Sequence, residues 1–391
     1  MRRRIFLLAG SNAAAAGALT GCAWVPSAGP RRGVIGEPGT PEEDLLRRYF
    51  VVDVDERSLA VLRRASPPSF AGTFPDARPP GPQRVGVGDV VQVTIWESAA
   101  GGLFSAPLVD RAGTGARSAL IPEQQVGQDG SITVPFAGRI RVVGSTPDVI
   151  ERTIVARLEG QAVQPQVLVT VPRNLTNTAT VLGEVTTGGR VPLTPRGDRL
   201  LDVIAVAGGV RSAPHETFVR LSRDGRTVSV PLQALVQRPA ENILVRPGDT
   251  LTVVRQPQTF VAAGATGRNA IVPFDAMGMS LLEAVGSAGG LLDFRVDPAG
   301  VYVMRRETAA LARDLGAPSQ MPLDGDAVRV VYRLNMREPM SFFTGRDFAM
   351  RDKDVLYAAS APLNELQKIL QIFNLTVQPF VTGATIGSAL R

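Results

Sequence analysis

The sequence predicts an α+β protein of several domains that ends in an amphipathic helix. Short stretches of alternating apolar and polar residues recur between segments with helical spacing, which favours a mixture of strands and helices. The 40 glycines and 30 prolines, with aromatic residues at only 5%, favour short strands and turns over long helices. Residues 182–210 recur without gaps at 263–291, which indicates one structural unit used twice.

The first 21 residues have the pattern of a secretory signal peptide. Arginines at positions 2–4 are followed by a short apolar run and by small residues that lead to Cys22. The run is shorter than the roughly 20 apolar residues of a membrane-spanning helix. The tetrapeptide Leu-Thr-Gly-Cys resembles the bacterial lipobox, in which diacylglycerol is attached to the cysteine sulfur and the chain is cleaved before it. Cys22, the only cysteine, is therefore predicted to carry a lipid; the alternative is a buried cysteine without a function.

The residue after Cys22 indicates the membrane to which the mature chain is sorted. In lipoproteins that position influences sorting, and Ala23 is not the aspartate associated with retention in the inner membrane. We therefore expect a lipid anchor in the outer membrane, with the bulk of the chain in the periplasm. A single cysteine cannot form an internal disulfide, so stability must come from packing and assembly.

The charge of the chain argues against a nucleic-acid partner. The signal peptide contains three arginines and no acidic residue, so its removal lowers the formal net charge from +6 to +3 and leaves 39 basic and 36 acidic side chains. A nucleic-acid-binding surface favours runs of basic residues interleaved with aromatic residues, and the sequence has no such run. We expect no nucleic acid among the partners.

Residues 22–82 are predicted to form a lipidated tether and a linker. Proline and glycine are frequent in residues 23–41. Glu42–Ala65 have the pattern of a helix, a strand at Tyr49–Val54 and a second helix. The six prolines and two glycines of Pro67–Pro82 indicate a semi-rigid linker.

Residues 83–173 are predicted to form the next domain. Its expected elements are, in order, a strand within Arg84–Glu97, a loop over residues 98–123, two paired strands within Val126–Thr146 with Gln128-Asp129-Gly130 as their turn, a helix from Pro147 to Leu158, and a strand at Gln166–Val171. The fixed φ of proline suits the first turn of the helix.

The duplicated segments belong to two further predicted domains, residues 178–256 and 259–358. At a constant offset of 81 residues, the triplet Ala207–Gly209 matches Ala288–Gly290. Each copy predicts two strands and a short helix. The double glycine either ends that helix or cradles a phosphate, and the first interpretation is favoured because phosphate-binding glycines open a helix.

Several motifs together resemble a known family. Gly88-Asp89 before an alternating strand, the segment D-G-x-I-x-x-P-x-x-G-x-I at Asp129–Ile140 and the following Gly144-x-Thr146 resemble the opening domain of the polysaccharide biosynthesis/export family of Wza-like outer-membrane lipoproteins. The duplicated units look like the soluble-ligand-binding β-grasp domains of that family, each closing with a Gly-Asp or Lys-Asp turn before a strand. The resemblance covers roughly residues 84–358.

This resemblance implies an architecture and a set of partners. It implies a ring of identical subunits, an octamer, around a large lumen through which capsular or extracellular polysaccharide leaves the periplasm for the cell surface. It also implies an inner-membrane polysaccharide co-polymerase as the partner that supplies the polymer.

Residues 362–391 are predicted to form an amphipathic transmembrane helix. From Leu363 to Leu390 such a helix is roughly 42 Å long, more than a hydrocarbon core of about 30 Å. The residues predicted to line a pore are Asn364, Gln367, Gln371, Asn374, Gln378, Thr382 and Thr385. The residues predicted to face lipid are Leu366, Leu370, Phe373, Val377 and Phe380. A helix this polar on one side cannot cross lipid alone; the resemblance favours a barrel of such helices over the alternative, a helix packed on another subunit.

The sequence shows no constellation typical of an enzyme. His215 is the only histidine, and Cys22 is assigned to a lipid. No cluster of metal ligands occurs, and no carboxylate pair stands out as suited to glycan hydrolysis. We therefore predict no catalytic residue, no cofactor and no metal. The alternative function is a periplasmic carbohydrate-binding lipoprotein without a pore, which would have no use for the helix at 362–391.

Overall fold

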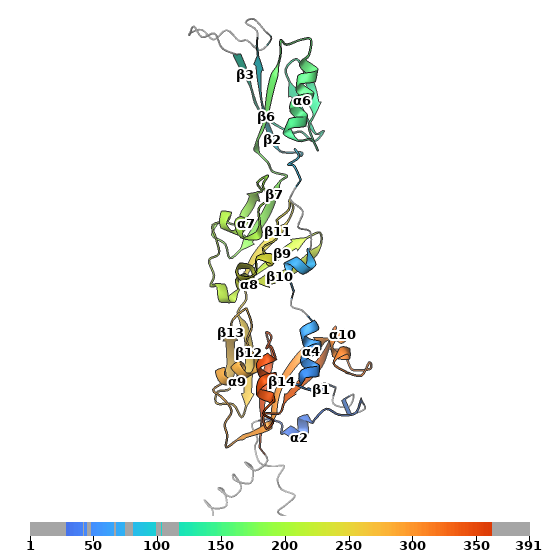
Figure 1. Ribbon diagram of the computed structural model, residues 1–391, viewed down its shortest axis with the longest axis vertical. Coiled ribbons are helices and arrows are strands. Elements are labelled where there is room, and N and C mark those ends of the chain that lie inside the picture. The colour runs from blue at the N-terminus through green and yellow to red at the C-terminus, as the bar shows by residue number, and fades with distance from the viewer. Residues whose placement is uncertain are drawn as a thin grey trace, which may run out of the picture. The chain divides into compact units, whose positions relative to one another are not determined.

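The computed structural model describes residues 29–41, 43–44, 48–65, 68–74, 81–98, 103 and 117–361 (Figure 1). The chain divides into two compact units. The terminal unit comprises Met1–Pro67 and Pro257–Arg391, and the central unit comprises Pro68–Gln256. Both units mix strands and helices, as the sequence predicts. Among the described residues, none of the helices has both the length and the apolar character required to cross a membrane.

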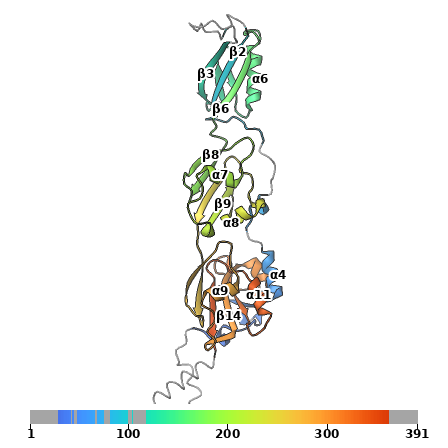
Figure 2. The same cartoon turned by 60° about the vertical axis from the view of Figure 1, so that its left-hand side comes forward.

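The amino-terminal half of the central unit is a three-stranded antiparallel sheet with a helix on one face (Figure 2). In spatial order the strands are β3 (Arg117–Gln125), β2 (Val90–Glu97) and β6 (Gln166–Arg173), and the helix is α6 (Pro147–Leu158). Alternate residues of β2, among them Val93 and Ile95, are buried with Ile150 and Ile154 of α6. A separate pair, β4 (Ser131–Val134) and β5 (Gly138–Arg141), contributes to the same core.

Two predictions in this half are wrong. The loop predicted over residues 98–123 is too long, because Arg117–Glu123 belong to β3. The turn between β4 and β5 is Pro135–Ala137, whereas Gln128–Gly130 lie between β3 and β4. Gln-Asp-Gly has the composition of a turn, but the turn within the pair contains Phe136 at φ 61°, a conformation that bulky residues rarely adopt. Composition alone therefore selected the wrong turn.

The carboxyl-terminal half of the central unit is the first repeat. Its sheet has the spatial order β10-β9-β11-β7-β8. The strands are β7 (Thr178–Gly183), β8 (Gly189–Pro192), β9 (Thr217–Arg223), β10 (Arg226–Pro231) and β11 (Thr250–Arg255). The helices are α7 (Leu200–Val206) and α8 (Leu232–Gln237), with two 3-10 turns, η2 (Pro214–Glu216) and η3 (Pro239–Glu241).

The second repeat lies in the terminal unit and has the same strand order with one strand added, β1-β15-β14-β16-β12-β13. Its own strands are β12 (Gln258–Gly264), β13 (Ala270–Phe274), β14 (Val296–Thr308), β15 (Ala327–Leu334) and β16 (Val355–Ser360). Its helices are α9 (Leu281–Ser287), α10 (Ala309–Asp314) and α11 (Ser341–Asp347). The shared order confirms that the duplicated segments are one structural unit used twice.

Both repeats end their first helix at the double glycine. Gly208 and Gly209 follow α7 with φ of 81° and 76°, and Gly289 and Gly290 follow α9 with φ of 80° and 75°. Glycine adopts this left-handed conformation at low cost because it has no Cβ. The prediction of a helix stop is therefore confirmed.

The strand added to the second repeat comes from residues that the sequence predicts as a tether. β1 (Phe50–Asp53) pairs in parallel with β15. The next helix, α4 (Glu56–Arg64), places Leu59 in the core of the same sheet. The strand and second helix predicted within Glu42–Ala65 are thus confirmed, whereas the first helix falls partly outside the described residues.

Part of the predicted linker is also folded. The short helix α5 (Phe70–Thr73) is anchored in the first repeat, where Phe70 is fully buried. The carboxylate of Glu241 accepts hydrogen bonds from the Ser69 hydroxyl at 2.6 Å and from the Phe70 amide at 2.7 Å. Residues 68–74 therefore pack as part of the central unit.

Candidate functional site

The residues predicted to carry the function lie outside the part of the chain that the structure describes. They are the lipidation site Cys22, the pore-lining residues Asn364, Gln367, Gln371, Asn374, Gln378, Thr382 and Thr385, and the lipid-facing residues Leu366, Leu370, Phe373, Val377 and Phe380. These assignments stay predictions. The structure does describe the two segments that lead to them, residues 29–37 and β16.

These two segments are in direct contact in the terminal unit. The hydroxyl of Tyr357 on β16 donates a hydrogen bond to the carbonyl oxygen of Pro30 at 2.8 Å. The amide of Ala361, at the carboxyl end of the described residues, donates to the carbonyl oxygen of Arg295 at 2.8 Å. The described residues therefore begin beside β16 and end directly after it.

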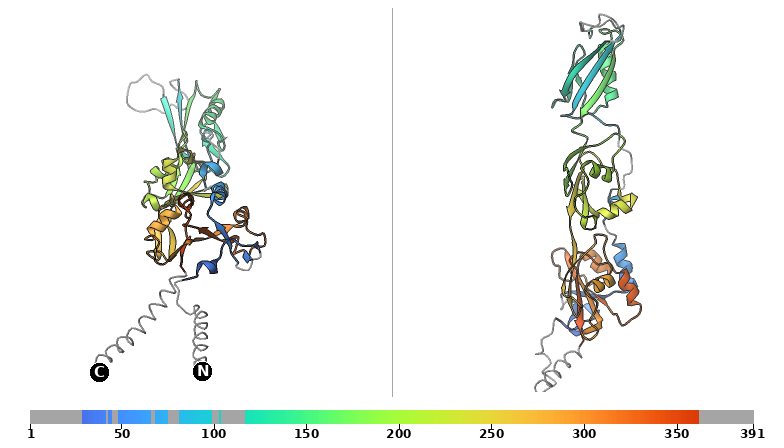
Figure 3. Two further views of the ribbon diagram at one scale, coloured as in Figure 1. Left: turned by 60° about the horizontal axis from the view of Figure 1, so that its bottom comes forward. Right: turned by 90° about the vertical axis from the view of Figure 1, so that its left-hand side faces the viewer.

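Apolar contacts hold the amino-terminal segment on one face of the second-repeat sheet, which we call the outer face. Alternate strand residues, among them Val331, Tyr302 and Tyr357, point to this face and pack against Ile35 of α2 (Arg32–Ile35). The hydroxyl of Tyr302 donates a hydrogen bond to the carbonyl oxygen of Gly36 at 3.4 Å. Burial raises the pKa of Tyr302 to about 12. Figure 3 shows this blue segment beside the orange and red strands.

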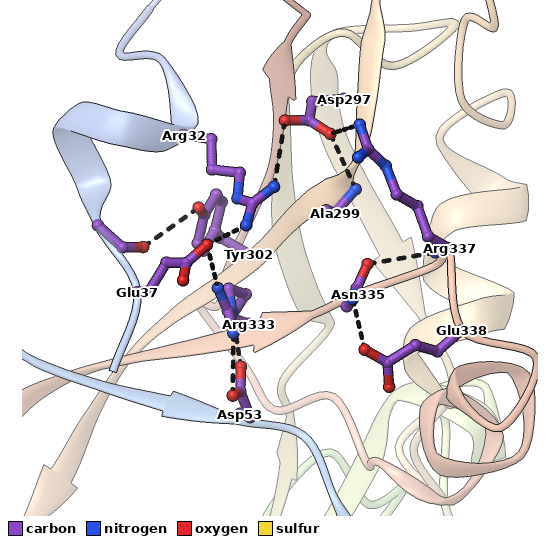
Figure 4. Close-up of polar contacts among 11 residues, drawn as sticks. Arg32, Glu37, Asp53, Asp297, Ala299, Tyr302, Arg333, Asn335, Arg337 and Glu338 are labelled. Atoms are coloured by element: carbon purple, nitrogen blue, oxygen red, sulfur yellow. Dashed lines mark hydrogen bonds and ion pairs between the residues drawn. The ribbon is translucent and has the colours of Figure 1, made fainter. Parts of the chain in front are cut away.

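A chain of ion pairs borders this apolar contact (Figure 4). Arg333 of β15 donates two hydrogen bonds to Asp53 of β1, at 2.6 and 3.0 Å, and lies 3.0 Å from Glu37. Arg32 also donates a hydrogen bond to Glu37. The hydrogen bond from Arg32 and the charge of Arg333 lower the pKa of the Glu37 carboxyl. Burial of Arg333 by itself would lower the pKa of its guanidinium. The hydrogen bonds to Asp53 act in the opposite direction, and the pKa of Arg333 is raised.

The chain of ion pairs continues to Asp297, whose side chain is only 6% exposed. Its carboxylate accepts hydrogen bonds from Arg337 at 2.9 Å and from the Ala299 amide at 3.1 Å, and it lies 3.8 Å from Arg32. Burial of a carboxylate is costly unless it is paired with an opposite charge and hydrogen-bonded. Docking of the amino-terminal segment partly removes these charged groups from water. The ion pairs compensate, because each charged group lies beside one of opposite sign.

The arrangement holds the amino-terminal segment in place. Each charged group of the chain of ion pairs is engaged with an opposite charge. Within the described ranges no group of three or more His, Cys, Asp or Glu side chains could hold a metal ion. His215 lies exposed on η2, in the central unit.

Sequence reasoning missed this docking contact. The sequence predicted a strand at Tyr49–Val54, but the partner of Asp53 in this strand, Arg333, lies 280 residues further along the chain. No local pattern specifies such a distant pairing. The available signal was a strand and a helix in a segment otherwise rich in proline and glycine, which indicated that the segment is more than a spacer.

The chain is similar to proteins named for polysaccharide export. Residues 77–172 match the model described as polysaccharide biosynthesis/export protein, and residues 177–253 and 258–358 match the SLBB domain. The capsule polysaccharide export outer membrane protein CtrA of Neisseria meningitidis serogroup B is 35% identical over 396 residues, 98% of this chain and 96% of CtrA. The capsule polysaccharide export protein BexD of Haemophilus influenzae is 32% identical over 381 residues, 95% of this chain and 96% of BexD. The Vi polysaccharide export protein VexA/TviF of Salmonella typhi is 28% identical over 292 residues, 73% of this chain and 76% of that protein.

Proposed function

The chain belongs to the polysaccharide biosynthesis/export family, and on this premise we propose that it forms a ring-shaped channel that exports capsular or extracellular polysaccharide across the outer membrane. The family is a transport component and not an enzyme, so the protein has to bind and guide a polymer rather than alter it. The relatives CtrA and BexD are named for capsule polysaccharide export.

The protein is held in the membrane by a lipid on Cys22 and by the helix of residues 362–391. The lipid and the helix are two attachments to the same membrane, and two attachments together make the anchoring stable. The bulk of the chain, including both SLBB domains with a β-grasp fold, lies in the periplasm.

The observation that carries this proposal is the hydrogen bond between Tyr357 and Pro30. Cys22 precedes Pro30 by eight residues, which span at most about 30 Å when fully extended. Residue 362 follows Tyr357 after four intervening residues. A lipid and a helix that enter one membrane have to leave the protein on the side that faces it, and this contact supports that arrangement.

The channel is a ring of identical subunits, an octamer, that receives polymer from an inner-membrane polysaccharide co-polymerase. In the ring, the uncharged polar faces of the terminal helices line a water-filled lumen and their apolar faces meet lipid. A polar stripe of this kind cannot face the hydrocarbon core without a partner.

Negative-stain imaging of the full-length protein, extracted from outer membranes in detergent, tests the channel. Rings with a central opening are the expected result. Surface polysaccharide should also disappear from cells that lack the protein, with polymer retained in the periplasm. A monodisperse monomer that binds polysaccharide would contradict the channel and support a periplasmic carbohydrate-binding lipoprotein.

A further inference from the structure

The two repeats can be compared residue by residue because their sheets have the same strand order and matched registers. Thr180 of β7 corresponds to Val261 of β12 at the offset of 81 residues. The aspartates that precede the last strand of each repeat, Asp249 and Asp354, match through the shared Gly-Asp or Lys-Asp turn and not through this offset. Positions directly across the sheet then follow from the strand pairing.

In the first repeat, one row of residues across the sheet is polar. Neighbours in this row pair directly from strand to strand and are, in spatial order, Thr227, Ser222, Thr250, Thr180 and Arg190. The hydroxyl groups of Ser222 and Thr227 form a hydrogen bond of 2.9 Å. All five side chains are half-buried or exposed, as expected for a sheet face that meets water.

In the second repeat, the matched row is apolar throughout. Its members, paired in the same order, are Val331, Met304, Val355, Val261 and Ile271, and β1 extends the row with Val51. The row lies on the outer face, whereas Phe260, Ala262 and Val272 point to the core on the other side. Each repeat buries its own core on the other side of its sheet. A core on that side therefore cannot explain why the five matched positions on this face are polar in one repeat and apolar in the other.

The amino-terminal segment covers only one end of this apolar row. Val51 and Val331 are buried beneath it, with exposed fractions of 0% and 5%. At the other end, Val261 is 38% and Ile271 is 69% exposed. Val261 and Ile271 face each other across β12 and β13, so they form one continuous apolar surface, here called the strand patch.

A second exposed apolar surface lies on the opposite side of the same sheet. Met340, Phe342 and Phe343, at the start of α11, are 55%, 50% and 67% exposed; we call them the helix patch. α11 packs on the inner face, since Gly345 approaches the side chains of Leu334 and Leu282. Figure 2 shows α4, α9 and α11 together beside β14.

The positions matched to Phe342 and Phe343 are polar in the first repeat. Phe342 and Phe343 precede Asp354 by 12 and 11 residues, and at the same distances before Asp249 the chain has Gln237 and Arg238. Both of these are exposed and polar. The second repeat thus differs from the first in having apolar side chains at the matched positions on each side of its sheet, although Val236, directly before Gln237, is 62% exposed in the first repeat.

We propose that the strand patch of one subunit packs against the helix patch of the next subunit, and that this contact joins the subunits of the ring. The proposal rests on the proposed channel and deepens it by assigning the interface. Head-to-tail association uses two different surfaces of the same chain, one for each neighbour. A pair of apolar patches on opposite sides of one sheet meets that requirement, and large aromatic side chains are typical of the buried centre of interfaces.

Thiol cross-linking of the full-length protein tests the contact. Ile271→Cys is combined in turn with Met340→Cys, Phe342→Cys and Phe343→Cys, and outer membranes are treated with a short bis-maleimide. At least one double variant should give a ladder of dimers and higher multimers on denaturing gels. Each single-cysteine variant should stay monomeric, which also controls for Cys22.

The first repeat supplies the matched control. The double variant Arg190→Cys/Arg238→Cys places thiols at the corresponding polar positions and should give no ladder. Ile271→Asp should convert rings to monomers in detergent, whereas Arg190→Asp should leave them assembled, and both should keep the thermal unfolding midpoint of the wild type.

The outcomes separate this inference from the channel itself. Rings of wild-type protein without a ladder in any double variant would overturn the interface and leave the channel standing. Rings that persist with Ile271→Asp would do the same, and would point to another occupant of the strand patch. Absence of rings in the wild type would refute the channel, and the interface with it.

Discussion

Arg305 and Asp354 face each other inside the second repeat through two parallel hydrogen bonds, from Nε to Oδ1 at 2.8 Å and from the guanidinium to Oδ2 at 2.6 Å. Their side chains are 5% and 1% exposed. In the first repeat, Arg223 and Asp249 pair in the same way at 2.9 and 2.6 Å. Each arginine also donates to the main chain of the turn before the last strand, so the pair fixes the end of the sheet in both repeats.

Loss of one partner of this pair should be costly. Asp354→Ala removes the carboxylate that accepts two hydrogen bonds from buried Arg305 and leaves only the 3.5 Å contact with Glu307, and we expect the terminal unit to lose about 3 kcal/mol of unfolding free energy. Hydrogen exchange of the β14 and β16 amides, measured under conditions in which exchange requires unfolding, reports the change. Asp326→Ala removes an exposed aspartate of the same unit and should change stability by less than about 0.5 kcal/mol. Equal effects of the two substitutions would show that the buried pair has no special role.

The sequence contained half of this arrangement. A Gly-Asp or Lys-Asp turn before a strand identified Asp249 and Asp354 as matched positions, and each accepts a hydrogen bond from the amide three residues earlier. Arg223 lies 26 residues before Asp249 and Arg305 lies 49 residues before Asp354, because the segment between arginine and aspartate is longer in the second repeat. An alignment without gaps therefore could not pair them.

A third turn of the same kind shows why the partner could not be inferred from the motif. Asp89 in the export domain accepts from the Gly86 amide at 2.8 Å, as its counterparts do. In place of an arginine it binds the amides of Leu175 and Thr176, at 2.8 and 3.0 Å. Local hydrogen bonding defines the turn, whereas the tertiary partner depends on which segment passes beside it.

Strands and helices were predictable where alternation or helical spacing was strong, as in β2 and α6. The pairing of β1 with β15 was not, because a parallel pairing between distant segments leaves no local trace. Cys22 and residues 362–391, which are predicted to attach the protein to the membrane, lie outside the described residues, so the sequence alone supports their roles.

The docked amino-terminal segment should loosen in acid. The pKa of Glu37 is lowered in the folded protein, so its charge stabilises docking above its ordinary pKa, and this contribution is lost as pH falls through the lowered value. Hydrogen exchange of the β1 amides, corrected for the intrinsic effect of pH, should therefore accelerate below about pH 4.5.

The matched variant for this effect is Glu37→Gln. It should speed exchange at pH 7 by about two- to fivefold, the range for an exposed ion pair, and should flatten the pH dependence. Arg333→Met should have a larger effect, because it also leaves Asp53 without its two hydrogen bonds. Identical pH profiles for the wild type and Glu37→Gln would assign the acid effect to another group.

The lipid anchor is tested by Cys22→Ser. Serine cannot accept diacylglycerol through a thioether, so labelled fatty acid should no longer be incorporated and the protein should lose one of its two membrane attachments. Salt and carbonate washes of the membrane fraction should then release more of the variant than of the wild type. Incorporation of label into Cys22→Ser would refute the lipobox interpretation.

The last prediction concerns the helix of residues 362–391, which we expect to cross the outer membrane with its polar stripe toward the lumen. Phe373→Asp places a charge on the lipid-facing side and should cost about 2.5–3.5 kcal/mol near the membrane centre, enough to block insertion or assembly. Asn374→Asp places the same charge one position along, on the lumen side, where water solvates it, and it should be tolerated. Both variants introduce one aspartate into the same turn of the predicted helix, so the helix propensity of aspartate cannot account for a difference between them. An epitope tag after Arg391 should be reached by antibody on intact cells, because a helix that crosses from the periplasm ends outside. A tag that becomes accessible only after the outer membrane is permeabilised would show that the helix does not cross, and the channel would then need another wall.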